Sequence, residues 1–260
     1  MIGDGLAVPP HPVSPGESFT ELLRAHGVEP RWVGSGSDRL DAPEGTTVLA
    51  FRYAEGVVMA GDRRATAGNL IAHRNVQKVF PADSHSAVAI SGTAGIAIEL
   101  IKLFQTELEH YEKLEGNRLS LEGKANYLAR MIRGQLPLAF QGLVVIPLFC
   151  GYDFEQQQGR LFSFDVVGGR YEETDHAATG SGGRDARLYL RTAFEAQLSE
   201  DAALRLAMEA LVAAAEEDTA TGGPDLQRGI YPNVVLVSSD GYREMAESDV
   251  ARVAREVVGS

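Results

Sequence analysis

The residues with the clearest chemical potential are Gly45 and Thr46, which stand side by side in the chain. If the bond between them is cut, Thr46 carries a hydroxyl nucleophile and a free α-amine on one residue. That amine has an ordinary pKa of about 8 and can act as general base for the hydroxyl. A glycine before the cut allows backbone geometries that bring the hydroxyl against its own carbonyl. Taken alone, this dipeptide fits the plain start of a β-strand better than a nucleophile made by cleavage, and the segments that follow it decide between the two.

The composition of the chain changes at the same junction. Residues 1–45 hold six of the eleven prolines and seven glycines, without a sustained apolar period. Such a segment is typical of a flexible leader. We therefore expect residues 1–45 to be a flexible leader, which a cut at the junction would free as a propeptide, and residues 46–260 to form the folded domain.

Overall composition excludes several classes of protein. The net charge of −12 disfavours binding to a phosphate backbone, so we expect no nucleic-acid partner. The single cysteine, Cys150, excludes an intrachain disulfide and a zinc site built on paired cysteines. Its apolar neighbours predict a buried structural thiol.

No membrane partner and a cytoplasmic location are also expected. The longest unbroken apolar stretch, from Leu143 to Cys150, has eight residues, whereas a membrane-spanning helix needs about 20. The first basic side chain is Arg24, which does not fit the basic start of a secretory signal.

The apolar pattern predicts alternating strands and helix pairs. The chain begins with a hairpin whose turn lies at residues 54–56, and a helix cap is expected at Ser120. Another helix is expected to open near Ser199 or Asp201. Strands are predicted over 86–90, 143–152, 161–166, 176–179 and 234–238, and helices over 97–111, 121–132, 188–198, 204–215 and 249–258. This order predicts an α+β domain with helix pairs covering the sheet faces.

Several well-known catalytic motifs are missing. The sequence has no phosphate-binding G-x-x-x-x-G-K-[ST] loop, no H-E-x-x-H motif and no G-x-S-x-G elbow. Its six histidines are scattered, so their spacing indicates neither a metal cluster nor a histidine-based triad. A nucleophile that works without histidine is therefore the better hypothesis.

Three segments after the junction, GDRRATAGN, NVQKVF and AISGTAG, resemble the signature of proteasome β subunits, which are N-terminal nucleophile hydrolases. The resemblance runs from Thr46 to the late ATGGPD segment, and the wording LEHYEKLEG is similar to the actinobacterial branch. It implies a four-layer αββα sandwich, with two antiparallel sheets between helix pairs. It also implies a threonine endopeptidase that is made as an inactive precursor.

The resemblance assigns the central roles to Thr46 as nucleophile, Asp62 as the family's acid and Lys78 as the lysine beside them. Physical chemistry agrees, because the apolar neighbours Val79 and Phe80 predict a buried lysine. A buried ammonium is costly unless a carboxylate such as Asp62 pairs with it. A positive charge near Thr46 would also favour the alkoxide that forms during attack.

Other roles follow from the resemblance alone. Gly92 matches the backbone N–H that stabilises the oxyanion, an interaction that can contribute about 3 kcal/mol. Ser181 and Asp218 match residues that support the terminal amine. Thr221 stands where many relatives have serine, and it retains the hydroxyl.

Substrate recognition is implied in the same way. Thr66 and Ala94 match positions that pair with the substrate main chain as an added strand. The residues that match the first side-chain pocket are all apolar, which predicts cleavage after hydrophobic residues. They are Ala65, Val76, Phe80, Ile90 and Ala94.

The family also implies partners, and no metal or organic cofactor. Its particles are stacked seven-membered rings, with β rings inside, α-subunit rings outside and a ring ATPase that feeds unfolded substrates. Two alternatives stay open: a bacterial two-ring threonine protease that works without α subunits, and a catalytically silent β-type subunit. The base for the first cut is also open, between Lys78 and a positioned water.

Overall fold

The computed structural model describes residues 45–68 and 70–259. Apart from Gly45, the predicted propeptide lies outside the described residues, so its flexibility and its removal stay predictions.

A first antiparallel sheet contains the predicted opening hairpin. In order across the sheet, its strands are β10 (His176–Gly180), β1 (Thr47–Tyr53), β2 (Gly56–Gly61), β11 (Asn233–Ser238) and β12 (Gly241–Glu244). The β1–β2 pairing confirms the predicted hairpin, with its turn at Ala54 and Glu55. The strand that follows Thr46 is thus an interior strand of its sheet, paired with β10 on one side and β2 on the other.

A second antiparallel sheet is built from the middle of the chain. Its strands, in order, are β5 (Val79–Asp83), β6 (Ser86–Gly92), β7 (Val145–Asp153), β8 (Gln158–Phe164) and β9 (Arg170–Glu173). A separate short hairpin is made of β3 (Ala65–Ala67) and β4 (Leu70–His73). In the chain it follows β2 and precedes β5.

The two sheets pack face to face through alternate residues of their strands. Val48 and Ala50 of β1 belong to the cluster between the sheets, whereas Leu49 and Phe51 belong to the cluster under the helices. This alternation is the period of two that a strand imposes on its side chains. Cys150 lies in the cluster between the sheets, which confirms the predicted buried thiol, and burial raises its pKa to about 12.

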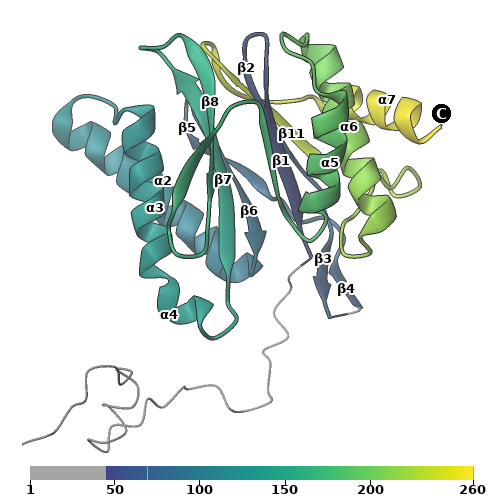
Figure 1. Ribbon diagram of the computed structural model, residues 1–260, viewed down its shortest axis with the longest axis horizontal. Helices are drawn as coiled ribbons and strands as arrows, with labels where there is room; N and C mark the ends of the chain where they lie inside the picture. The colour runs from purple at the N-terminus through teal and green to yellow at the C-terminus, as the bar shows by residue number, and fades with distance from the viewer. Residues whose placement is uncertain (1–44, 69, 260) are drawn as a thin grey trace, which may run out of the picture. The chain divides into compact units, whose positions relative to one another are not determined.

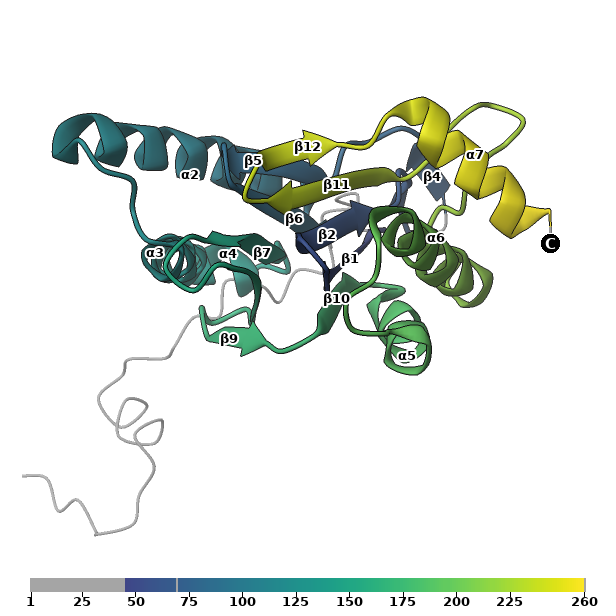
Figure 2. The same cartoon turned by 90° about the horizontal axis from the view of Figure 1, so that it is seen from above.

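Helices cover both outer faces, as Figures 1 and 2 show. The second sheet is covered by α2 (Ala94–Glu115) and α3 (Leu121–Gly134), and α4 (Leu136–Ala139) follows α3. The first sheet is covered by α5 (Gly183–Ala193), α6 (Glu200–Glu217) and α7 (Glu247–Val258). The predicted four-layer α+β sandwich is therefore confirmed.

The local predictions hold for most elements and are wrong at one helix. Ser120 and Ser199 accept capping hydrogen bonds at the starts of α3 and α6, as predicted. The helix predicted over 188–198 occupies Gly183–Ala193 instead. Its buried face is made of Gly183, Ala186 and Leu190, and the first two side chains are too small to mark the start of the helix in the apolar pattern. No helix among the described residues is long and apolar enough to cross a membrane.

Candidate active site

Thr46 lies immediately before β1, with its hydroxyl against the carbonyl that precedes it. Thr46 Oγ1 donates a hydrogen bond to Gly45 O at 2.7 Å. Lys78 Nζ donates to the same oxygen at 3.1 Å. A hydroxyl and an ammonium thus meet at the carbonyl of the bond that is predicted to be cleaved.

Gly45 fits this place because it has no side chain. A Cβ on residue 45 would lie 2.3 Å from Thr66 Oγ1 and 2.8 Å from Ala220 O. Contacts that short require the surrounding backbone to move. The close approach of the Gly45 carbonyl to Thr46 therefore depends on glycine, as the sequence predicts.

Asp62 follows β2 and is fully buried, with both carboxylate oxygens paired. Oδ1 accepts from Thr47 N at 2.7 Å and from Lys78 Nζ at 2.5 Å. Oδ2 accepts from Arg64 N at 2.8 Å and from Gly222 N at 2.9 Å. Four donors use the available acceptor sites of a carboxylate, so Asp62 is held in one orientation.

Lys78, one residue before β5, is also buried, with 2% exposure. Besides Asp62 Oδ1 and Gly45 O, its Nζ donates to Arg64 O at 2.5 Å. Three acceptors match the three hydrogens of an ammonium. Burial lowers the pKa of Lys78, and the attraction of Asp62 offsets this effect only in part.

The late part of the chain approaches Thr46 from the opposite side. Ser181 donates to Thr46 O through its backbone N at 2.9 Å and through Oγ at 3.3 Å. Thr221 Oγ1 donates to Asp218 Oδ2 at 2.6 Å. Burial opposes ionisation of Asp218, but hydrogen bonds such as those from the Thr221 hydroxyl and the Ala220 N–H outweigh it, so the pKa of Asp218 lies below its usual value.

Gly92 ends β6 with a φ of +99°, a conformation that favours glycine. A Cβ at this position would lie 2.0 Å from Val144 O. Backbone shape and space thus both require glycine here.

An open cleft of about 580 Å³ lies beside these residues. Gly45, Thr66, Gly92 and Ser181 line it, together with Gly68, Ser91, Gly142, Val144, Ile146, Thr179, Gly180 and Ala220. Thr46 is only 6% exposed while Gly45 is attached. Loss of residues 1–45 would therefore uncover Thr46 at the cleft.

The five residues predicted to form the side-chain pocket are not among those that line this cleft. Ile90 and Phe80 pack in the cluster beneath α2 and α3, and Ala65 is buried on β3. Val76 and Ala94 are half-buried. Strand alternation places Ser91 on the cleft side of β6 and its neighbour Ile90 on the helix side.

Sequence reasoning missed three residues that hold the site: Thr47, Arg64 and Gly222. Arg64 contributes its N–H to Asp62 and its carbonyl to Lys78, and its guanidinium donates to Thr219 O at 2.9 Å and Thr221 O at 3.1 Å. In the sequence, the signal that could have identified this residue is its place as the second arginine of the GDRR segment.

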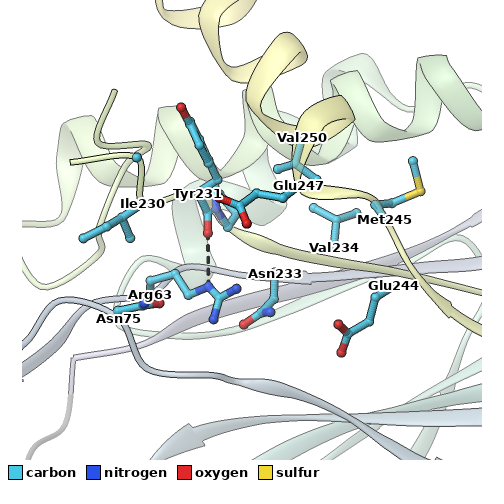
Figure 3. Close-up of a pocket in the computed structure, with 12 residues that line it drawn as sticks. Arg63, Asn75, Ile230, Tyr231, Asn233, Val234, Glu244, Met245, Glu247 and Val250 are labelled. Atoms are coloured by element: carbon cyan, nitrogen blue, oxygen red, sulfur yellow. Dashed lines mark hydrogen bonds between the residues drawn. The ribbon is translucent and has the colours of Figure 1, made fainter. Parts of the chain in front are cut away.

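The preceding residue, Arg63, fixes the other side of the same loop. Its Nε donates to Tyr231 O at 3.1 Å in a separate pocket of about 280 Å³, as Figure 3 shows. Residues of β11 and α7, including Asn233 and Val250, line that pocket. The loop that carries Asp62 is therefore anchored on two sides, by consecutive arginines.

Among the described residues, no group of three or more His, Cys, Asp or Glu side chains is arranged to hold a metal ion. The expectation that the protein needs neither metal nor cofactor stays a prediction.

Comparison with known proteins agrees with the resemblance seen in the sequence. Residues 42–225 match the family described as "Proteasome subunit". A "Proteasome subunit beta" from Acidimicrobium ferrooxidans is 56% identical over 224 residues, 86% of this chain and 82% of that protein. A protein of the same name from Streptomyces griseus is 53% identical over 219 residues, 84% of this chain and 78% of that protein. Another, from Stackebrandtia nassauensis, is 54% identical over 253 residues, 94% of this chain and 90% of that protein.

Proposed function

Because this chain belongs to the proteasome subunit family, with β subunits of actinobacteria among its relatives, we propose that it is a threonine endopeptidase activated by removal of residues 1–45. The observation that carries the proposal is the meeting of Thr46 Oγ1 and Lys78 Nζ at the Gly45 carbonyl oxygen. A nucleophile and a positive charge at one carbonyl are what acyl transfer needs.

In the first step, Thr46 Oγ attacks the Gly45 carbonyl carbon of its own chain. The C–N bond breaks, an ester forms on Oγ, and the nitrogen gains a proton as it becomes the α-amine. Water then hydrolyses the ester, which releases residues 1–45 as a carboxylic acid. Lys78, already at Gly45 O, supports the negative charge on that oxygen, and the Gly92 N–H is assigned the same task.

The mature enzyme repeats this chemistry on a substrate. The free amine of Thr46, with a pKa of about 8, takes the hydroxyl proton as Oγ attacks the substrate carbonyl. Ser181, Asp218 and Thr221 support the amine, and Lys78 with Asp62 favours the alkoxide. The acyl ester is then hydrolysed by water.

Substrate binding follows the family pattern in this proposal. Thr66 and Ala94 pair with the substrate main chain. Ala65, Val76, Phe80, Ile90 and Ala94 keep in this proposal the role of an apolar first pocket, which rests on the family resemblance alone because none of them lines the cleft. A series of fluorogenic peptides should show a preference for hydrophobic residues before the cut, and a clear preference for acidic or basic residues would remove this assignment.

The expected setting is a cytoplasmic core particle of stacked seven-membered rings. The β rings lie inside α-subunit rings, and a ring ATPase delivers unfolded proteins through the α ring. Enclosure then supplies the selectivity that an apolar pocket lacks. Neither a nucleic acid nor a membrane has a part in this proposal.

The test is peptide hydrolysis by the particle purified after co-expression with its α partner. Wild-type particles should be active, Thr46→Ser should keep part of the activity, and Thr46→Ala should have none. Assembled, inactive wild-type particles that retain residues 1–45 would favour the silent-subunit alternative. Full activity without any α subunit would favour the two-ring alternative.

A further inference from the structure

Thr47, to which the proposed mechanism gives no role, carries a buried hydroxyl with two polar contacts. Its Oγ1 lies 2.6 Å from Thr221 Oγ1 and accepts from Gly182 N at 2.9 Å. Both partners are distant in sequence, since Gly182 precedes α5 and Thr221 follows α6. The hydroxyl therefore joins the first strand to two separate loops of the site.

The direction of every hydrogen bond in this group can be deduced. The lowered pKa of Asp218 leaves its carboxylate ionised at neutral pH, so it only accepts. The Thr221 hydroxyl donates its single proton to Asp218. In its contact with the Thr47 hydroxyl it must therefore be the acceptor. Thr47 in turn accepts from the Gly182 N–H. The result is one ordered chain, from Gly182 through Thr47 and Thr221 to Asp218.

Both hydroxyls pack directly against Gly182, which has no room for a side chain. A Cβ on Gly182 would lie 2.6 Å from Thr221 Oγ1 and 2.8 Å from Thr47 Oγ1. Thr47 and Thr221 are both fully buried, so water does not compete for their bonds. Chains of hydrogen bonds that end on a charge strengthen one another in such an environment.

The chain also governs the position of Ser181. Ser181 binds the Thr46 carbonyl, and the next residue, Gly182, binds the Thr47 hydroxyl. The turn that contains Ser181 and Gly182 thus binds two consecutive residues, Thr46 and Thr47. If the Thr47 hydroxyl is lost, Gly182 loses an acceptor and Thr221 loses a donor, so the turn that holds Ser181 against Thr46 and the hydroxyl that binds Asp218 are both less constrained.

We propose that Thr47 is a positioning residue, whose hydroxyl orients Thr221 and Asp218 and aligns Ser181 with Thr46. This inference rests on the proposed function. It adds a residue that acts through others and that touches no substrate. It differs from simple core packing because it requires an oxygen that both gives and accepts a hydrogen bond.

The decisive comparison is Thr47→Val against Thr47→Ser in particles co-expressed with the α partner. Valine keeps the shape and loses the hydroxyl, whereas serine keeps the hydroxyl. We expect Thr47→Val to lower kcat about 10-fold or more, with little change in KM, and Thr47→Ser to stay within about threefold of wild type. Ser163→Ala is a matched control, because it removes a hydroxyl that donates to Glu173 at 2.6 Å on β8, a strand outside the cleft.

A pH profile separates positioning from packing. Without the chain, Thr221 supports the Asp218 carboxylate less well, so the pKa of Asp218 rises and the acid limb of kcat moves to higher pH. Thr221→Val should move the limb in the same direction. The double variant should be little worse than either single variant, because the chain acts as one unit.

Two results would overturn the inference while leaving the proposed function intact. One is a Thr47→Val particle with normal kcat and an unmoved acid limb. The other is a lower kcat that Thr47→Ser does not rescue. If Thr47→Val fails to assemble, Thr47→Ser against Thr47→Ala decides in the same way, because these variants differ by one oxygen. Failure of the wild-type chain to free Thr46 would instead contradict the proposed function.

Discussion

In the part of the chain that the structure describes, two buried lysines pair with aspartates at 2.5 Å: Lys78 with the fully buried Asp62, and Lys124 with the partly buried Asp83. Both have a hydroxyl nearby, since Ser86 Oγ donates to Asp83 at 2.6 Å. The second cluster even adjoins a cavity of about 260 Å³, which Lys124 helps to line. By residue types alone, the two regions are nearly equivalent.

The difference lies in what the lysine and the hydroxyl face. Lys78 and Thr46 both point at the Gly45 carbonyl, and Gly45 lines the open cleft. Ser86 is fully buried, spends its proton on Asp83 and does not line the cavity beside Lys124. Residue types therefore do not make a site, and what distinguishes the first cluster from the second is a backbone carbonyl, that of the cleft-lining Gly45, on which a lysine and a hydroxyl converge.

Substitution of the two lysines, Lys78 and Lys124, tests this comparison with the largest expected effect. Lys78→Met should slow release of residues 1–45 by about 100-fold or more, because the charge at Gly45 O is lost. Lys124→Met should leave cleavage near the wild-type rate. Each variant leaves a carboxylate without its ammonium partner, which should cost about 3 kcal/mol of stability at the fully buried Asp62 and less at the partly buried Asp83. Intact mass over time and urea unfolding measure the two effects. Equal loss of cleavage in both folded variants would contradict the distinction.

The next largest effect is expected at Gly92. Gly92→Ala places a methyl group 2.0 Å from Val144 O, so the backbone beside the cleft must shift. Peptide hydrolysis should fall about 100-fold. Gly116→Ala is the matched control, because Gly116 also has a positive φ, ends α2 and has open space around its Cβ position. The control should lose about 1 kcal/mol of stability and no activity. Activity that survives in Gly92→Ala would remove Gly92 from the site.

The aspartates give a smaller effect. Asp62→Asn keeps one acceptor oxygen but turns an NH₂ group toward backbone N–H donors. The variant also lacks the negative charge that balances the Lys78 ammonium. Cleavage should slow about 10- to 100-fold, the range for losing charge-assisted hydrogen bonds. Asp83→Asn should affect stability and leave cleavage unchanged. Rates of processing for the two folded variants decide the matter, and a slower Asp83→Asn would count against the comparison.

The smallest effect is a pH dependence of stability in the second cluster. Burial opposes ionisation of Asp83, but Lys124, Ser86 and the His85 N–H outweigh it and hold the pKa of Asp83 below its usual value. A carboxylate of this kind stabilises the fold above its unfolded pKa, and the contribution is lost as the pH falls through the folded pKa. The stability gap between wild type and Lys124→Met should therefore shrink at acidic pH. Urea unfolding at several pH values measures it, and a gap that widens would contradict the assignment.

The layers were predictable because strands such as β1 and β11 have alternating or continuous apolar residues in the sequence. Serine is also a preferred residue at the start of a helix, which made the caps at Ser120 and Ser199 predictable. The start of α5 was not, since Gly183 and Ala186 carry little hydrophobic signal. Short strands such as β5 and β12 depend on pairing with distant partners and have weak patterns of their own.

The site was predictable where a residue type is unusual in its setting, as with Lys78 inside an apolar segment, or where the family resemblance names it. Thr47 and Arg64 were missed because their contacts are long-range or run through the backbone. Thr47 Oγ1 meets a hydroxyl 174 residues away, and Arg64 acts on Asp62 and Lys78 through its N–H and carbonyl. Spacing along the chain carries no trace of such contacts.

The most direct test of the central claim is the intact mass and N-terminal sequence of the chain from particles assembled with the α partner. The account predicts that the wild-type chain begins at Thr46 and that the Thr46→Ala chain keeps residues 1–45. A wild-type chain that retains residues 1–45 in a correctly assembled particle would contradict it, as would cleavage before residue 46 in the Thr46→Ala variant.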